Sequence, residues 1–173
     1  LTETFAVFLL PVQAGLGATR AEISATYSVY MLAYALAAPF AGQLVDRLGA
    51  RVTYGAGLLS LGSGYALAGL ATEVWHYYIA VGLCGGLGAA ALGMVAASSL
   101  LSRWFSRRMG SVMAAPYAAV GAGMLIFPPL TQVLLDWVGW RSALYVLGLG
   151  TLALLPLTLA MPLGRSGQAP VIP

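Results

Sequence analysis

The sequence predicts an all-α integral membrane protein, and three observations lead to this fold class. Hydrophobic residues make up 60% of the 173 residues and charged residues only 8%, whereas roughly a quarter of the residues of a soluble domain are charged. The apolar residues gather in runs, most of which reach the roughly 20 residues that a helix needs to cross a bilayer. Short segments rich in glycine, aspartate and arginine separate these runs. An ordinary soluble domain is therefore excluded.

The apolar runs predict one bundle of helices over residues 1–163. The first run is already under way at Leu1 and is short for a spanning helix, so we expect this helix to be truncated at its start. The polar segment 164–173 contains Pro and Gly and is typical of the start of a linker. The predicted helices lie at about residues 1–17, 23–43, 52–71, 75–101, 111–135 and 142–163.

The segment Gly42–Val52 (GQLVDRLGARV) predicts the topology. It places Asp46, Arg47 and Arg51 in one tight turn, which makes the flanking helices an antiparallel hairpin. Cytoplasmic loops carry an excess of Lys and Arg. If this turn is cytoplasmic, six of the eight basic residues fall inside and two outside, and we expect a multi-pass protein of the cell (plasma or inner) membrane. The inside set is Arg47, Arg51, Arg103, Arg107, Arg108 and Arg165, and the outside set is Arg20 and Arg141.

An internal repeat supports a symmetric architecture. Residues 44–51 (LVDRLGAR) and 134–141 (LLDWVGWR) share the pattern L-x-D-x-x-G-x-R. Both segments are predicted turns, and three crossings lie between them, so they face opposite sides of the membrane. Such a relation is an inverted-topology repeat, which transporter folds use to build a site near the membrane midplane. Turns between helices favour Asp, Gly and Arg in any case, which leaves a chance match open.

Five polar residues are candidates for contact with a solute. Glu3 is predicted near or just past the membrane midplane, and an intramembrane carboxylate is by default a functional hypothesis; it would couple protons or bind substrate, or else only line a cavity. Tyr30 and Tyr34 are spaced i, i+4 on the second predicted helix, and Tyr117 and Gln132 lie on the fifth. Their polar groups would either line a cavity or pack within the bundle.

Other function classes lack support in the residues. The sequence has one His, one Cys, and no metal-ligand cluster, phosphate loop or paired intramembrane carboxylates, so we expect no catalytic residue, metal or cofactor. The arginines lie at the ends of apolar runs and form no basic face, which argues against nucleic acid as a partner. A membrane enzyme stays an alternative only if catalytic groups come from another part of a longer protein.

Six residues of the first turn carry a resemblance to a known family. Gly42, Leu44, Asp46, Arg47, Gly49 and Arg51 match the motif G-x-L-x-D-R-x-G-x-R. This motif joins the second and third helices of major facilitator superfamily transporters, and the chain resembles their N-terminal half. Ala50 departs from the basic residue that is frequent at its position. Residues 17–24 (GATRAEIS), 103–110 (RWFSRRMG) and 139–141 (GWR) are also similar to segments of the monocarboxylate and oxalate–formate carriers of this superfamily.

The resemblance implies a fold and a set of partners. Members have twelve helices in two six-helix halves, each built from two inverted three-helix repeats. The chain would supply the first half, with segment 164–173 opening the cytoplasmic central linker. Its partners would be the lipid bilayer, a small-molecule solute and the missing C-terminal half.

The resemblance also implies a mechanism. The chain would belong to a secondary carrier that moves a small organic solute, a monocarboxylate or dicarboxylate, by alternating access. Gly42, Asp46, Arg47, Gly49 and Arg51 would form a gate in which the carboxylate docks against a helix N-terminus of the other half; otherwise they only form a solvated turn. A drug or metabolite efflux carrier and a non-transporting sensor of the same fold stay open as alternatives.

Overall fold

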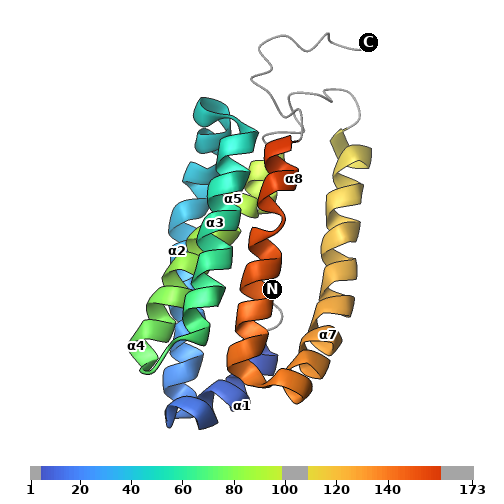
Figure 1. The fold of residues 1–173 in the computed structure, drawn as a ribbon. Helices are drawn as coiled ribbons and strands as arrows, with labels where there is room; N and C mark the ends of the chain where they lie inside the picture. The colour runs from blue at the N-terminus through green and yellow to red at the C-terminus, as the bar shows by residue number, and fades with distance from the viewer. Residues whose placement is uncertain (1–4, 99–108, 161–173) are drawn as a thin grey trace, which may run out of the picture.

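The computed structural model describes residues 5–98 and 109–160, and this part of the chain is helical with no strand (Figure 1). One element is a π-helix, η2, and the others are α-helices. The elements are α1 (Phe5–Leu16), α2 (Arg20–Leu48), α3 (Ala50–Gly69), α4 (Val74–Tyr77), η2 (Tyr78–Cys84), α5 (Gly85–Leu92), α7 (Met109–Leu152) and α8 (Leu155–Ala160).

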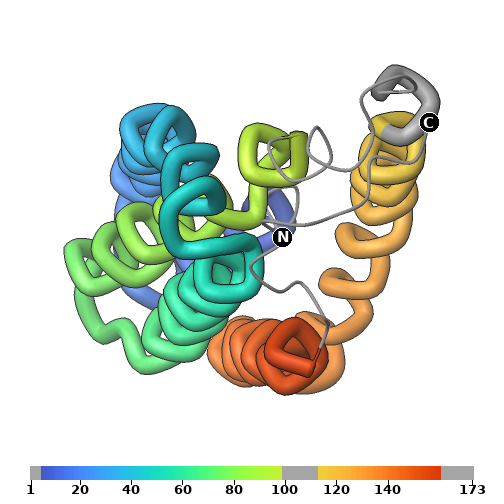
Figure 2. Tube along the Cα trace, turned by 90° about the horizontal axis from the view of Figure 1, so that it is seen from above, coloured from blue at the N-terminus to red at the C-terminus, as the bar shows by residue number. Residues whose placement is uncertain are grey.

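Helix α3 lies at the centre of the bundle. It packs against α5 on one side and against the second part of α7 on the other. Figure 2 shows this second part and α8, in orange and red, beside α3, whereas the first part of α7, in yellow, stands apart. Glycines let the backbones approach closely: a Cβ on Gly148 would lie 2.6 Å from the Ala66 nitrogen and 2.7 Å from the Gly62 oxygen. Small residues at such seams allow tight helix packing in membranes.

Helix α2 starts three residues earlier than the sequence predicted, at Arg20 instead of residue 23. The reason is a capping box before the apolar run. The Thr19 backbone N–H donates to Glu22 Oε2 over 2.7 Å, and the Glu22 N–H donates to Thr19 Oγ1 over 3.3 Å. Each side chain thus satisfies a backbone group that a helix start leaves unpaired. The polar residues that were expected in a loop form the first turn of the helix.

The predicted turn Gly42–Val52 is much shorter than expected. Helix α2 continues to Leu48 and α3 begins at Ala50, so a single residue separates the two helices. That residue, Gly49, has φ 87° and ψ 154°, a conformation open essentially only to glycine. Its N–H donates to the Val45 oxygen over 3.1 Å and closes α2. One glycine therefore reverses the chain, and the charged residues around it are helical.

The second predicted turn has the same form. Residues 136–141 lie within α7, which is broken only at Gly139, with φ 76° and ψ 166°. Here too the helices run closer to the glycine than the predicted ends at 135 and 142. The α2–α3 turn and the break in α7 lie at opposite ends of the bundle (Figure 1).

The fourth predicted helix, at 75–101, is less regular than expected. It starts with α4, passes through the π-helical turn η2 and continues as α5 to Leu92. Gly93 then adopts an extended ψ of 177°, after which residues 94–98 are helical. Close packing accompanies the π-helix: a Cβ on Gly64 of α3 would lie 2.5 Å from the Ala80 oxygen. Ser60 Oγ donates to the Cys84 oxygen over 2.8 Å, so α3 supplies a hydrogen bond where the helix type changes.

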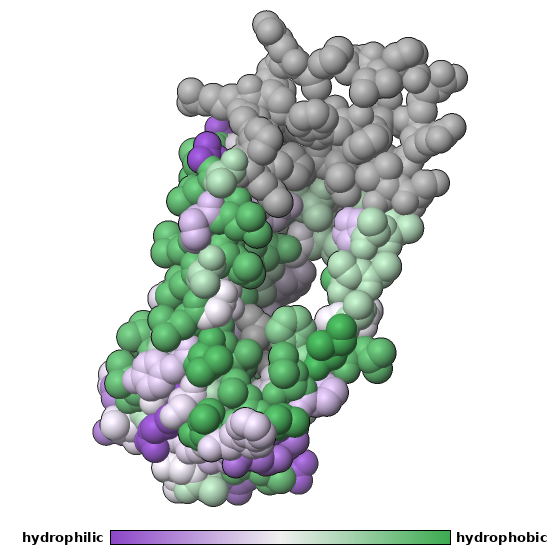
Figure 3. Space-filling model, turned by 45° about the vertical axis from the view of Figure 1, so that its right-hand side comes forward, coloured by the Kyte–Doolittle hydropathy of each residue, from purple (hydrophilic) through white to green (hydrophobic). Residues whose placement is uncertain are grey.

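The surface of the bundle is suited to lipid. Within residues 5–98 and 109–160, three helical segments are long and apolar enough to cross a membrane, namely Arg20–Leu48, Val74–Ser98 and Met113–Ala160, the last with its break at Gly139. Large aliphatic side chains are exposed along them, such as Leu36 (63%) and Leu125 (77%). Figure 3 shows hydrophobic residues over the middle of the visible face and hydrophilic ones towards its ends. Exposed apolar surface of this extent is stable only in contact with lipid or further protein.

Candidate functional site

The predicted gating residues surround the α2–α3 turn. Asp46 and Arg47 are exposed on the last turn of α2, and Arg51 is exposed on the first turn of α3. Gly42 lies further back on α2 and is partly buried. Asp46 has an interaction partner within the chain. The turn therefore presents its charges outward from the end of the bundle.

A small apolar cluster supports this turn from inside. Ala41 and Val45 of α2, Ala50 of α3 and Ala96 of the segment 94–98 are each at most 4% exposed and pack together. The turn is thus attached to the fourth predicted helix as well as to its own hairpin. A rigid support of this kind holds the charged side chains at a fixed place relative to the bundle.

Tyr30 and Tyr34 belong to a column of aromatic rings. Their ring centroids lie 6.5 Å apart, and Tyr27 stacks on Tyr30 at 6.1 Å. Phe5 of α1 contacts Tyr27 at 5.4 Å and extends the column to a second helix. Tyr30 is 5% exposed and Tyr27 39%. Sequence reasoning missed Tyr27, although its spacing from the other two tyrosines, i, i+3 and i+7, places all three on one helix face.

The candidate residues of α7 lie elsewhere. Tyr117 is 61% exposed and, among the described residues, makes no ring contact with the column on α2. It lies on the first part of α7, which stands off from the other helices and leaves a hollow (Figure 3). Gln132 Nε2 donates to Asp136 Oδ1 over 3.0 Å, one helical turn away. Glu3 lies outside the described residues.

The opposite end of the bundle is held by polar contacts between elements. Arg141 Nη2 donates to the Ala71 oxygen over 3.1 Å, and its guanidinium lies 4.2 Å from the Trp140 ring centroid. The Tyr78 hydroxyl donates to the Glu22 oxygen over 2.8 Å. These bonds tie the second part of α7 to the end of α3, and η2 to the start of α2. The described residues contain no group of three His, Cys, Asp or Glu side chains that could hold a metal ion.

These features define a class: a multi-pass, all-helical membrane protein whose paired helices reverse at single glycines. The chain belongs to the Major Facilitator Superfamily, whose family model matches residues 1–171. The resemblance inferred from the first turn is thereby confirmed, and so is the prediction of an integral membrane protein. The chain therefore belongs to a family of transporters, and this family is non-enzymatic.

Similar curated proteins include several monocarboxylate transporters. Monocarboxylate transporter 11 of Homo sapiens is 37% identical over 138 residues, which cover 79% of this chain and 29% of that protein. Monocarboxylate transporter 13 of Bos taurus is 32% identical over 82% of this chain and 33% of that protein. The MFS-type transporter YcxA of Bacillus subtilis (strain 168) is 27% identical over 90% of this chain and 38% of that protein. The chain thus spans about a third of the length of the relatives it matches.

Proposed function

We propose that this chain forms the N-terminal six-helix half of a secondary carrier that moves a small organic monocarboxylate by alternating access. Similarity to monocarboxylate transporters 11 and 13 supports the substrate class. Alternating access needs a second body against which the first one moves. A C-terminal half of the same transporter would supply that body and close the solute cavity.

The observation that carries the proposal is the α2–α3 turn. Asp46 and Arg47 are exposed at the end of a long helix, and the single residue Gly49 joins it to the next. A carboxylate in this position is able to dock against a helix N-terminus of the other half, where it gains roughly 0.3–1 kcal/mol. Forming this contact in one state and breaking it in the other biases the equilibrium between the two states.

The two glycine turns support an inverted repeat within the half. Gly49 and Gly139 occupy the same position in the two copies of L-x-D-x-x-G-x-R and adopt nearly the same φ and ψ. Their turns lie at opposite ends of the bundle (Figure 1). Two three-helix units of opposite topology would then face the solute pathway together.

The solute contacts in this proposal come from the faces of α2 and α7. Tyr27, Tyr34 and Tyr117 keep part of their side chains exposed, and a phenol hydroxyl donates readily to a carboxylate. Gln132 adds an amide already oriented by Asp136. Glu3 stays a candidate for proton coupling, and Tyr30, being buried, supports the rings on either side of it.

Flux measurements with the full-length protein that contains this sequence test the proposal. In proteoliposomes, saturable uptake of labelled pyruvate is expected, and Asp46→Asn should lower its rate about fivefold, since about 1 kcal/mol corresponds to that factor. Glu73→Gln is a matched control, because Glu73 directly precedes α4 at the other end of the bundle, where its carboxylate accepts a hydrogen bond from Trp75 Nε1. Absence of flux with any monocarboxylate, in a folded preparation, contradicts the carrier function.

A further inference from the structure

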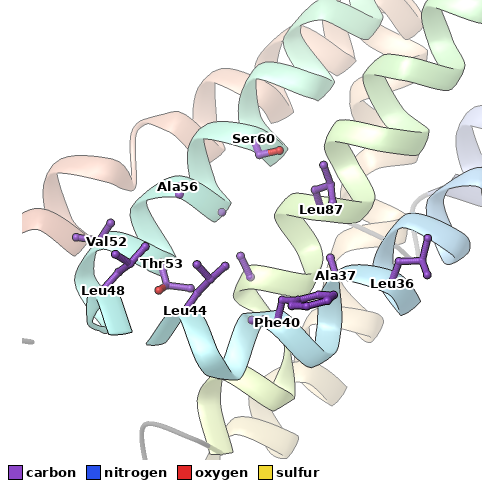
Figure 4. Close-up of a pocket in the computed structure, with 13 residues that line it drawn as sticks. Leu36, Ala37, Phe40, Leu44, Leu48, Val52, Thr53, Ala56, Ser60 and Leu87 are labelled. Atoms are coloured by element: carbon purple, nitrogen blue, oxygen red, sulfur yellow. The ribbon is translucent and has the colours of Figure 1, made fainter. Parts of the chain in front are cut away.

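An apolar groove follows α2 and α3 on the outside of the bundle, with α5 as its floor (Figure 4). It encloses about 500 Å³. Leu36, Phe40 and Leu44 of α2 form one wall, Val52 and Ala56 of α3 the other, and Leu87 of α5 lies beneath. Leu36 is 63% and Phe40 59% exposed, so the groove is open along its length to whatever surrounds the protein.

The described residues that line the groove offer an occupant no free hydroxyl. Two hydroxyl-bearing side chains line it, and both donate to backbone oxygens of the chain. Thr53 Oγ1 bonds the Gly49 oxygen over 3.1 Å, and Ser60 Oγ bonds the Cys84 oxygen over 2.8 Å. The groove therefore selects hydrocarbon, because a polar occupant would lose its hydrogen bonds to water without replacement.

The dimensions of the groove match one acyl chain. From Leu36 to Leu48 the α2 wall extends about 18 Å at 1.5 Å per residue, slightly more than half of a hydrocarbon core about 30 Å thick. A volume of about 500 Å³ over this length leaves a mean cross-section of about 28 Å². An α-helix about 10 Å across needs about 80 Å². An extended acyl chain within one leaflet therefore fits inside the groove, whereas a helix would insert only one ridge of side chains into it.

A positive charge lies on the groove face at its outer end. Arg47 follows Leu44 by three residues and Phe40 by seven, so all three share one face of α2. Asp46 follows Leu44 by two residues and lies on another face. On α3, Arg51 precedes the groove residues Val52 and Thr53 by one and two positions. Residues at these spacings do not share a helix face, so Arg51 also lies away from the groove. Among the described arginines, Arg47 is therefore the one on the groove side of α2, and it is exposed at the end of the groove.

We propose that this groove is a binding site for an anionic phospholipid of the leaflet at the α2–α3 turn. Its acyl chain lies along Leu36–Leu48, and its phosphate pairs with the Arg47 guanidinium at the membrane surface. A guanidinium binds phosphate through two parallel hydrogen bonds, and headgroup charge adds to the attraction. This site is separate from the proposed solute pathway and does not depend on the identity of the transported solute.

Photo-crosslinking with the full-length protein tests this site. The protein is reconstituted with phosphatidylglycerol or phosphatidylcholine that carries a diazirine in the acyl chain, and labelled peptides are quantified by mass spectrometry. Label on residues 36–60 is divided by label on residues 124–130 of α7, where Leu125 is 77% exposed. This ratio should be about fivefold higher for phosphatidylglycerol, as expected from about 1 kcal/mol for one basic residue near the surface.

Point variants distinguish the contribution of the Arg47 charge to lipid binding from the contribution of the apolar groove. Arg47→Gln should abolish the preference for phosphatidylglycerol, Arg47→Lys should keep most of it, and Arg51→Gln is the matched control that should leave it unchanged. Ala56→Phe should fill the groove and remove label for both lipids, while label on α7 reports that the bundle is intact.

Equal labelling by the two lipids in the unmodified protein would overturn the proposal. So would equal effects of the two arginine variants, or a groove that neither lipid labels because a helix covers it.

Discussion

Gly49 and Gly139 adopt the same backbone conformation in two different helix pairs. Gly49 has φ 87° and ψ 154°, and Gly139 has φ 76° and ψ 166°. A side chain in this region of φ and ψ collides with the backbone, so other residues almost never adopt it. Each glycine ends one helix and starts the next within a single residue. The fold therefore uses one kind of turn twice, once at each end of the bundle.

Replacing either glycine should strain the backbone alone. A Cβ at Gly49 or Gly139 would meet nothing within 4 Å, so only the conformation opposes it. We expect Gly49→Ala and Gly139→Ala each to lower the free energy of unfolding by about 1–3 kcal/mol in detergent. Gly121→Ala is the control, because this exposed helical glycine also has open space but a negative φ. If alanine left the free energy of unfolding unchanged at all three sites, the proposed backbone strain would be contradicted.

Alanine substitutions at Gly148 and Gly150 distinguish the effect of close packing on stability from the effect of helix propensity. A Cβ on Gly148 would lie 2.6 Å from the Ala66 nitrogen, whereas Gly150 has nothing within 4 Å. Gly148→Ala should push α7 from α3 and cost about 1–3 kcal/mol of stability. Gly150→Ala should be neutral or slightly stabilising, because alanine is the better helix former. Thermal unfolding of both variants measures the difference, and equal midpoints would refute the tight seam.

Arg141 is expected to stabilise the junction of α3 and α7. Its Nη2 donates to the Ala71 oxygen over 3.1 Å, directly after α3 ends. Arg141→Gln should lower the free energy of unfolding by about 1–2 kcal/mol, and Arg141→Lys should recover part of this loss. Arg20→Gln, at an exposed helix start, is the control. A stability unchanged by Arg141→Gln would show that the bond contributes nothing.

The orientation of the bundle is testable by cysteine labelling. Cys84 is first replaced by Ala, and single cysteines are then placed at Leu48, beside the α2–α3 turn, or at Thr72, at the other end. Because most arginines of the predicted loops belong to the side of Leu48, an impermeant maleimide should label Leu48→Cys only from the cytoplasm. It should label Thr72→Cys only from outside. The reverse pattern would invert the proposed topology.

The helical membrane class and the two reversals follow from local sequence. A long apolar run in lipid must satisfy its own backbone hydrogen bonds, and a helix is the simplest way to do so. The motif around Gly49 and its copy around Gly139 mark the reversals, because a short Asp- and Arg-containing segment with glycine interrupts the apolar runs. The prediction from the sequence made both turns longer than they are in the structure. Charged residues such as Asp46 and Arg51 are compatible with helix, and only the glycine has to leave it.

The tertiary structure decided what lies beside what. The ring contact of Phe5 with Tyr27, the hydrogen bond from Ser60 to Cys84, and the approach of Gly148 to Ala66 join residues on different helices. The groove between Phe40, Ala56 and Leu87 arises in the same way. Periodicity tells which residues share a face of one helix, but the rotation and offset of each helix against its neighbours depend on packing over the whole bundle. The charges of the α2–α3 turn were therefore visible in the sequence, whereas the groove that ends at Arg47 was not.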